Sequence, residues 1–402
     1  MVIKLDMIQA VALAVIVLFI GQKTKNKLTF LDKYCIPAPV IGGLLFVFLT
    51  LILKVTNILT FDMDITLQAV FMTAFFTTIG FTASLQLLKK GGKQVLIFLA
   101  ITAVLIILQD ITGVTLAKIF GLSPIIGLCT GSVPMVGGHG TSAAFGPLFE
   151  AKGIAGATTV ALASATFGLV MGSMIGGPIG KKLLEKNNLS YPMKTVNSKN
   201  SKDATVSNED TKKPMIPDNF MSAASQILLA MGIGTIISAL FEKTGFAFPG
   251  YIGGMLAAAV LRNIADATKS YKVHLDEIDV IGGISLSLFL SMALMGLKLW
   301  ELADLALPLV IMLFAQTVLM ALFAYFVTFK VMGRDYDAAV MACGQCGFGM
   351  GATPNAMANM EAMTLKYGHA ERAFFVVPLV GGLFVDFVNV GIITTFMNFF
   401  IK

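Results

Sequence analysis

The sequence contains few charged residues. Asp, Glu, Lys and Arg make up 13% of its 402 residues, whereas a soluble domain contains about 25%. Hydrophobic residues make up 56% of the chain, and its mean hydropathy is +0.83. So few charges cannot cover a water-facing surface. The low charge therefore excludes an ordinary soluble protein and indicates that lipid surrounds much of the chain.

Cysteine and histidine are also scarce. The four cysteines, at positions 35, 129, 343 and 346, lie in or near apolar sequence, which excludes the disulfide framework of a small secreted protein. Among the three histidines, only His139 lies in an apolar segment, and no nucleophile is paired with any of them. We therefore expect neither an enzyme nor an organic cofactor. The net charge of +6 is explained by lysines that set membrane topology, so we expect no nucleic-acid partner.

Long apolar runs predict helices that cross a membrane. A spanning helix needs roughly 20 apolar residues, and the runs are continuous rather than alternating as in barrel strands. We therefore predict an all-α polytopic membrane protein with ten transmembrane helices. Five are expected at Met7–Ile20, Val40–Leu59, Leu67–Leu88, Val95–Phe120 and Thr158–Lys181. The other five are expected at Met221–Phe241, Tyr251–Leu261, Val280–Leu299, Leu305–Phe329 and Ala373–Phe399.

The chain divides into two halves of similar length. Residues 184–219 are polar and lack apolar periodicity, so we predict a cytoplasmic linker between an N-terminal repeat, 1–183, and a C-terminal repeat, 220–402. Four patterns recur at offsets of 205 to 212 residues: Pro39–Gly43 with Gly250–Gly254, Gln109 with Gln316, Gly137–Ala144 with Gly349–Ala356, and Gly176–Gly177 with Gly381–Gly382. Five helices per half is an odd number, so the repeats would be inverted in the membrane.

The basic residues agree with this orientation. When the linker is placed in the cytoplasm, 22 of the 29 Lys and Arg residues fall on the cytoplasmic side of the ten spans, as the positive-inside rule requires. Both termini are then expected on the external side.

Two segments are apolar enough for a membrane but too rich in Gly, Pro and hydroxyl residues for one lipid-facing helix. They are residues 121–156, which we call hairpin 1, and residues 338–360, which we call hairpin 2. Non-helical backbone at this depth is tolerated only inside protein or beside water, so we predict two re-entrant hairpins that enter from opposite sides. Their broken tips would expose N–H groups that suit a carboxylate and carbonyl groups that suit sodium.

Polar side chains in these segments are candidate ligands. No intramembrane Lys or Arg is evident, so an anionic substrate would depend on backbone N–H groups and on Ser132, His139, Thr141, Ser142, Thr353 and Asn355. Asp110 and Asp386 lie inside predicted spans, where a charge costs about 2.5–3.5 kcal/mol on insertion scales. Together with Asn389, one turn after Asp386, they are candidate sodium ligands. The alternative for each is a structural polar residue that is paired inside the protein.

Several stretches resemble the sodium/glutamate symporter family of bacterial inner membranes. They are Gly137–Thr141, Ala165–Val170, Ser285–Glu301, Tyr336–Val340 and Cys346–Asn359, in both halves. The resemblance implies uptake of L-glutamate with sodium as the coupling ion, a homodimer in the lipid membrane, and an elevator-type motion of a core that carries both hairpins. Gln345 stands where we expect His in the better-known members of this family, and Asp110 stands where we expect Asn. We include Gln345 among the candidate substrate ligands.

Two rival functions remain open, and the first of them keeps the same architecture. The first is sodium-coupled transport of citrate or another dicarboxylate, because related transporters share inverted repeats and Gly-rich hairpins. The second is sodium/proton antiport, in which Asp110 and Asp386 would exchange the ions.

Overall fold

The computed structural model describes residues 2–28, 36–56, 58–189, 216–243, 250–297, 305–368 and 370–400. The first half contains β1 (Val2–Leu5), α1 (Met7–Lys27), α3 (Ala38–Val55), β2 (Thr60–Met63), α4 (Thr66–Thr82), α5 (Leu85–Ile119), α6 (Pro124–Leu128), α7 (Ser132–Met135), α8 (Gly138–Ala151) and α9 (Ala157–Lys186). Most of the predicted linker, residues 190–215, lies outside the described residues, as do Cys35 and His369.

The second half is helical through most of its described residues. It contains α10 (Pro217–Glu242), α11 (Tyr251–Thr268), α12 (Leu275–Met295), α13 (Ala306–Phe323), the π-helical turn η2 (Ala324–Thr328), α14 (Phe329–Val331), α15 (Tyr336–Phe348), α16 (Thr353–Tyr367), α17 (Glu371–Leu379), the π-helical turn η3 (Val380–Phe384) and α18 (Val385–Phe400).

Eight helical segments among the described residues are long and apolar enough to cross a membrane. The chain is therefore an integral membrane protein, as its composition predicts. Helices α4 and α11 lie where two further spans are predicted, but they are shorter or less apolar than the eight. Ten spans stay a prediction.

Strands β1 and β2 pair in parallel, from Val2 opposite Thr60 to Leu5 opposite Met63. The sequence does not predict this pairing, because strands of four residues are too short to show a two-residue periodicity.

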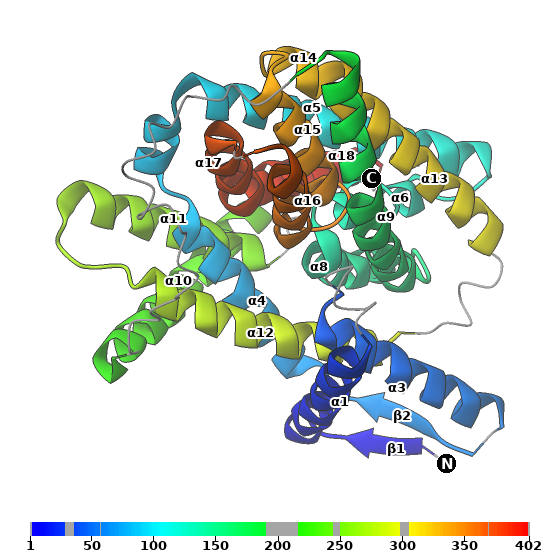
Figure 1. The fold of residues 1–402 in the computed structure, drawn as a ribbon. Coiled ribbons are helices and arrows are strands. Elements are labelled where there is room, and N and C mark those ends of the chain that lie inside the picture. Colours follow the sequence, from blue (N-terminus) through cyan, green and yellow to red (C-terminus); the bar gives the residue numbers. More distant parts are fainter. Residues whose placement is uncertain are drawn as a thin grey trace.

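The helices form two groups (Figure 1). We call the first group the scaffold; it contains α1, α3, α4 and α10–α12, in which α4 packs against α11 and α12, and α12 packs against α3. We call the second group the core; it contains α5–α9 and α13–α18, in which α9 packs against α8, α13, α15 and α16. Each group therefore takes its helices from both halves of the chain.

Near the start of each half, two helices of the scaffold meet through a glycine. A Cβ atom at Gly42 of α3 would lie 2.0 Å from the carbonyl oxygen of Val17 in α1. A Cβ atom at Gly253 of α11 would lie 2.0 Å from the carbonyl oxygen of Gly234 in α10. Only glycine permits backbones to approach so closely. Gly42 and Gly253 also occupy equivalent places in one of the recurring sequence patterns, so this pattern corresponds to a similar helix contact in each half.

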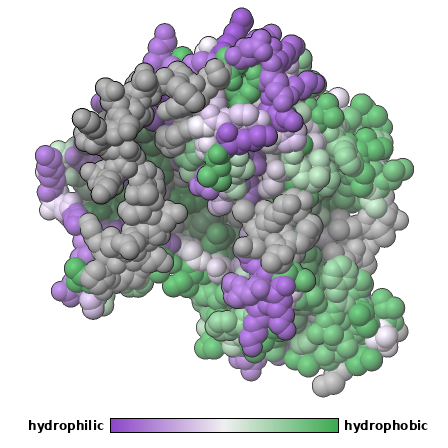
Figure 2. Space-filling view, viewed as in Figure 1, coloured by the Kyte–Doolittle hydropathy of each residue, from purple (hydrophilic) through white to green (hydrophobic). Residues whose placement is uncertain are grey.

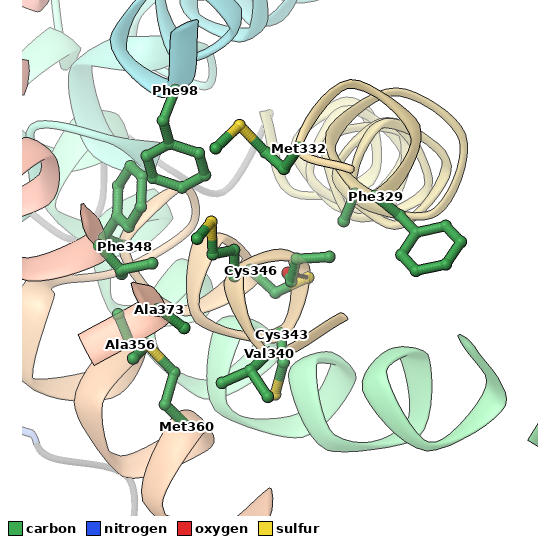
Figure 3. Close-up of a cluster of buried hydrophobic side chains, with 14 of the residues drawn as sticks. Phe98, Phe329, Met332, Val340, Cys343, Cys346, Phe348, Ala356, Met360 and Ala373 are labelled. Atoms are coloured by element: carbon green, nitrogen blue, oxygen red, sulfur yellow. Dashed lines mark hydrogen bonds between the residues drawn. The ribbon is translucent and has the colours of Figure 1, made fainter. Parts of the chain in front are cut away.

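The apolar interior of the core surrounds both cysteines of hairpin 2. Cys343 and Cys346 are fully buried in a cluster that includes Phe98, Phe348 and Met360 (Figure 3). Both cysteines are free, and each thiol donates to a backbone carbonyl oxygen. These surroundings are those of small packing residues rather than of a redox pair.

The outer surface separates apolar from polar regions (Figure 2). Apolar side chains cover the parts formed by α3 and α13, where Ile52, Leu307 and Phe314 are exposed. Lysines gather where α9 ends beside η2: the ammonium groups of Lys182 and Lys186 lie 5.8 and 5.5 Å from the ring centre of one tyrosine, Tyr325. An apolar surface with charged ends is the pattern that a lipid bilayer selects.

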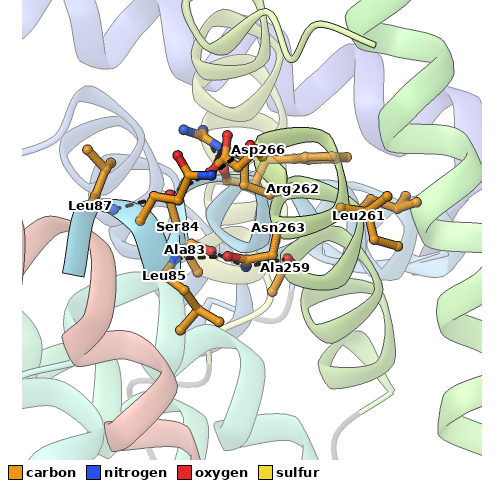
Figure 4. Close-up of polar contacts among 12 residues, drawn as sticks. Ala83, Ser84, Leu85, Leu87, Ala259, Leu261, Arg262, Asn263 and Asp266 are labelled. Atoms are coloured by element: carbon orange, nitrogen blue, oxygen red, sulfur yellow. Dashed lines mark hydrogen bonds and ion pairs between the residues drawn. The ribbon is translucent and has the colours of Figure 1, made fainter. Parts of the chain in front are cut away.

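Polar residues of α11 form hydrogen bonds with the short segment that connects α4 of the scaffold to α5 of the core (Figure 4). The side chain of Asn263 accepts the N–H of Leu85 at 2.8 Å and donates to the carbonyl oxygen of Ala83 at 2.8 Å. The hydroxyl of Ser84 donates to the carboxylate of Asp266 at 2.5 Å. The connection between the two groups is therefore fixed by a helix from the other half of the chain.

Candidate functional site

Both predicted hairpin segments are broken helices. In hairpin 2, α15 and α16 have 13 and 15 residues and are separated by residues 349–352. They pack closely against each other, since a Cβ atom at Gly347 would be 2.3 Å from the backbone nitrogen of Ala356. In hairpin 1, three short helices replace a single long one. None of these helices reaches the roughly 20 residues that a membrane span requires. Both segments are thus broken into short helices, and their re-entrant course in the membrane stays a prediction.

The tips of the two hairpins touch. Gly138, at the start of α8, has a φ of +59°, a conformation that residues with a side chain rarely adopt. A Cβ atom at Gly138 would lie 3.0 Å from the carbonyl oxygen of Gly351 in hairpin 2. The tips of the two hairpins are therefore in contact in this fold.

Helix α9 supports both tips. The imidazole Nε2 of His139 in hairpin 1 lies 3.0 Å from the hydroxyl of Thr166. The side-chain amide of Asn355 in hairpin 2 donates to the carbonyl oxygen of Leu169 at 2.9 Å. Because both hairpins are bonded to one short stretch of α9, that helix fixes their relative position.

Hairpin 2 is also held by a pair of buried glutamines. The side-chain amide of Gln109 in α5 donates to the carbonyl oxygen of Gly349 at 2.8 Å. The amide of Gln316 in α13 donates to the carbonyl oxygen of Gln109, also at 2.8 Å. Gln109 thus contacts hairpin 2 directly, and Gln316 supports Gln109.

Replacing Gln109 by leucine is expected to destabilise the protein. The carbonyl oxygen of Gly349 would be left buried without its partner, which lowers the free energy of unfolding by about 1–3 kcal/mol. The midpoint of thermal unfolding of the purified protein measures this loss. Gln22→Leu is the control, because the side chain of Gln22 is bonded to the exposed Asn26. Equal melting temperatures of the two variants would show that the glutamine contact carries no stability.

A cavity of about 330 Å³ lies between the hairpin tips and the scaffold. Its polar side chains come from the core: His139 and Thr141 of α8, Thr353 and Asn355 of α16, and Asp386 of α18. The scaffold contributes an apolar wall, formed by Phe75, Phe76 and Ile79 of α4 and by Leu286 and Leu290 of α12. The core therefore supplies all the polar side chains of the lining, together with apolar ones such as Leu169 and Phe348, whereas the scaffold side is apolar.

Two helices begin at this cavity. Gly138 and His139, at the start of α8, and Thr353, at the start of α16, are among its lining residues. The first N–H groups of a helix have no partner within that helix, and the helix dipole adds partial positive charge there. No Lys or Arg is among the described residues that line the cavity. An anion in it would therefore be met by helix N-termini and hydroxyl groups.

A second polar cluster, which we call the oxygen cluster, surrounds Ser132 in hairpin 1. One carboxylate oxygen of Asp110 accepts the N–H of Ser132 at 2.8 Å, and the amide of Asn389 donates to the Ser132 carbonyl oxygen at 3.3 Å. The other carboxylate oxygen of Asp110, the Ser132 hydroxyl and the Asn389 amide oxygen have no hydrogen-bond partner among the described residues, although all three residues are 0% exposed. Buried oxygens that lack donors are suited to a hard cation.

The structure divides most of the predicted site residues between two places. The cavity brings together His139, Thr141, Thr353, Asn355 and Asp386, and the oxygen cluster brings together Asp110, Ser132 and Asn389. Two candidates lie in neither place. The hydroxyl of Ser142 donates to the carbonyl oxygen of Gly138 at 2.7 Å. The side chain of Gln345 is bonded to Thr102 and Thr328.

The apolar pattern does not reveal the scaffold wall of the cavity. Phe75, Phe76 and Leu290 lie in long apolar runs, where a residue that faces a cavity has the same character as one that faces lipid. Nor does the sequence identify Thr166 as the partner of His139. The only signal is a hydroxyl residue in an apolar helix, and such hydroxyls often bond the backbone of their own helix.

Comparison with known families shows to which group this chain is related. The family model described as "Sodium/glutamate symporter" matches residues 3–369. The chain belongs to the sodium/glutamate symporter family. A sodium/glutamate symporter of Escherichia coli (strain K12) is 41% identical over 394 residues, which are 98% of each chain. One of Haemophilus influenzae is 37% identical over 386 residues, which are 96% of this chain and 95% of the relative.

Membership of this family confirms the resemblance found in the sequence. The match extends over both hairpins and over Asp110 and Ser132 of the oxygen cluster, and ends before α17 and α18. The family is one of symporters, which agrees with the expectation that the chain is a transporter and not an enzyme.

Proposed function

We propose that this chain imports L-glutamate together with sodium, as a secondary active symporter. The names of the family and of both relatives support this function. The observation that carries it is the pairing of two sites. A cavity with two helix N-termini, suited to a small anion, accompanies a cluster of unpaired buried oxygens, suited to a cation. Hairpin 1 and α18 contribute residues to both.

The proposed sodium position is among Asp110, Ser132 and Asn389. The carboxylate of Asp110 is buried and has no positive partner among the described residues, and such a charge is costly unless a cation or a proton compensates it. Sodium would supply the charge and take the three unpaired oxygens as ligands. The other predicted sodium ligand, Asp386, lines the cavity instead.

Sodium and glutamate would be coupled through hairpin 1. Ser132 of the oxygen cluster precedes Gly138, the first residue of α8, by six positions. A cation that fixes Ser132 would therefore also restrict the start of α8, where the substrate carboxylate is expected. The same cation would offset the net negative charge of glutamate during its passage through the membrane.

The division into scaffold and core supports an elevator-type motion. The cavity lies where the two groups meet, so a core that slides against the scaffold would carry the substrate with it. We propose that the scaffold forms the homodimer in the bacterial inner membrane. The inverted ten-span topology with external termini is supported by contacts between segments assigned to one side, such as Lys118 with Phe400.

Uptake of radiolabelled L-glutamate into proteoliposomes tests the proposed function. We expect an inward sodium gradient to drive accumulation, and replacement of external sodium by choline to reduce uptake to the level of protein-free vesicles. Equal uptake in choline would refute the symport. Complete inhibition by excess citrate, with little inhibition by unlabelled glutamate, would instead favour a dicarboxylate carrier. Sodium-driven proton movement without an organic substrate would favour an antiporter.

A further inference from the structure

We propose that Asp386 binds the α-ammonium group of the substrate and thereby selects an amino acid over a plain dicarboxylate. This inference rests on the proposed function and assigns a further specificity residue to the same cavity. Asp386 lies in the first turn of α18, lines the cavity and is partly exposed. Its carboxylate forms no hydrogen bond or ion pair with any other residue that the structure describes.

The charges around the cavity match those of an amino acid with two carboxylates. The N-termini of α8 and α16 offer positive ends, one from each hairpin. In the first turn of α16, Pro354 has no N–H and the N–H of Asn355 is bonded to Ala352, so the N–H of Thr353 is the one left for a carboxylate. The neutral side chains of Thr141, Thr353 and Asn355 add hydrogen-bonding groups. Asp386 is the only acidic residue among the described residues that line the cavity. A substrate that carries two negative groups and one positive group would find a partner for each.

Sodium is less suited than an ammonium group to the position beside Asp386. A sodium ion needs several oxygen ligands, and the carbonyl oxygen of Gly381, which also lines the cavity, already accepts the hydroxyl of Thr353 at 2.8 Å. The facing scaffold wall is apolar. One turn along α18, Asn389 belongs to the oxygen cluster, which offers three unpaired oxygens. Sodium therefore has a better site in the oxygen cluster, and Asp386 remains available for the α-ammonium group of the substrate.

Competition binding to the purified protein tests this role. The probes are L-glutamate and glutarate, a dicarboxylate of the same length that lacks the ammonium group. For the unaltered chain we expect glutarate to bind roughly 100-fold more weakly or worse, as expected for a site whose buried polar group would lose its partner. In Asp386→Asn, glutamate should bind much more weakly while glutarate changes little, so that the ratio of the two affinities falls by about tenfold or more.

The control is Asp62→Asn, which removes the same charge from β2, outside the cavity lining. Asp62→Asn should leave the ratio of the glutamate and glutarate affinities unchanged. The sodium concentration for half-maximal binding is measured in parallel, and at saturating glutamate it should stay nearly constant in Asp386→Asn. Equal weakening of glutamate and glutarate would overturn the inference. A raised sodium requirement with an unchanged ratio would also overturn it and make Asp386 a sodium ligand.

A second variant covers the case in which Asp386→Asn does not fold. Asp386→Glu keeps the charge but extends it by one methylene group into the cavity, so preference should move from L-glutamate toward the shorter L-aspartate. An unchanged preference in a folded Asp386→Glu protein would contradict the inference. Failure of the proposed function is distinct, because it appears in the unaltered chain as an absence of sodium-driven uptake.

Discussion

Replacing Gly168 by alanine is expected to remove nearly all sodium-driven glutamate uptake. A Cβ atom at Gly168 in α9 would lie 2.2 Å from the carbonyl oxygen of Met350, beside the tip of hairpin 2. Neither backbone can move freely, because the next residue of α9, Leu169, accepts the side chain of Asn355 in the same hairpin. The methyl group would therefore push the tip away from α9, and such overpacking typically costs about 1–3 kcal/mol.

Gly177→Ala is the matched control for this experiment. Gly177 lies on the same helix, but a Cβ atom there would meet no described atom within 4 Å apart from its chain neighbours and the adjacent backbone of α9. Alanine also favours the helix over glycine, so this variant should transport at least as well as the unaltered chain. Uptake into proteoliposomes is compared at equal protein content. If Gly168→Ala transports as well as Gly177→Ala, the close contact between α9 and hairpin 2 is not needed for function.

Replacing Asp110 by asparagine is expected to raise the sodium concentration for half-maximal uptake by about tenfold or more, which corresponds to about 1.4 kcal/mol of binding free energy. The amide oxygen can still accept the N–H of Ser132, so hairpin 1 should keep its shape. The negative charge would be lost, and with it the main attraction for the cation.

Sodium dependence of uptake, measured at saturating glutamate, separates this effect from a loss of folding. The melting temperature of Asp110→Asn should stay close to that of the unaltered chain, whereas its half-saturation for sodium should rise. Asp62→Asn again controls for the loss of one negative charge. An unchanged sodium requirement in Asp110→Asn would remove this carboxylate from the proposed cation site.

The breaks in the two hairpins were predictable because their cause is local. Gly, Pro and hydroxyl residues disfavour a helix wherever they gather, and lipid tolerates no unpaired backbone. A buried amide in a membrane helix requires a polar partner, so the sequence also indicates that Gln109 has one. The structure places that partner in hairpin 2. These features depend on residue type and position along the chain more than on the rotation of any helix.

Which residues line the site depends on the rotation of each helix about its own axis, and the sequence alone does not determine that rotation. Gln345 and Asn355 are both polar residues of hairpin 2, but one is bonded to Thr102 of α5 and the other lines the cavity. The direction of each side chain is set by how α15 and α16 pack against other helices. The separation of Asp386 from the oxygen cluster follows from the same packing, although Asn389 lies only one turn away.

The joint between α4 and α5 also sets an order of assembly. Ser84 and its partner Asp266 are separated by 182 residues, so the ribosome completes the first half well before this bond can form. Until α11 is inserted, the joint has neither Asn263 nor Asp266 to hold it. In the newly made first half, the connection between α4 and α5 therefore lacks these hydrogen bonds, and it gains them only once the second half has been made.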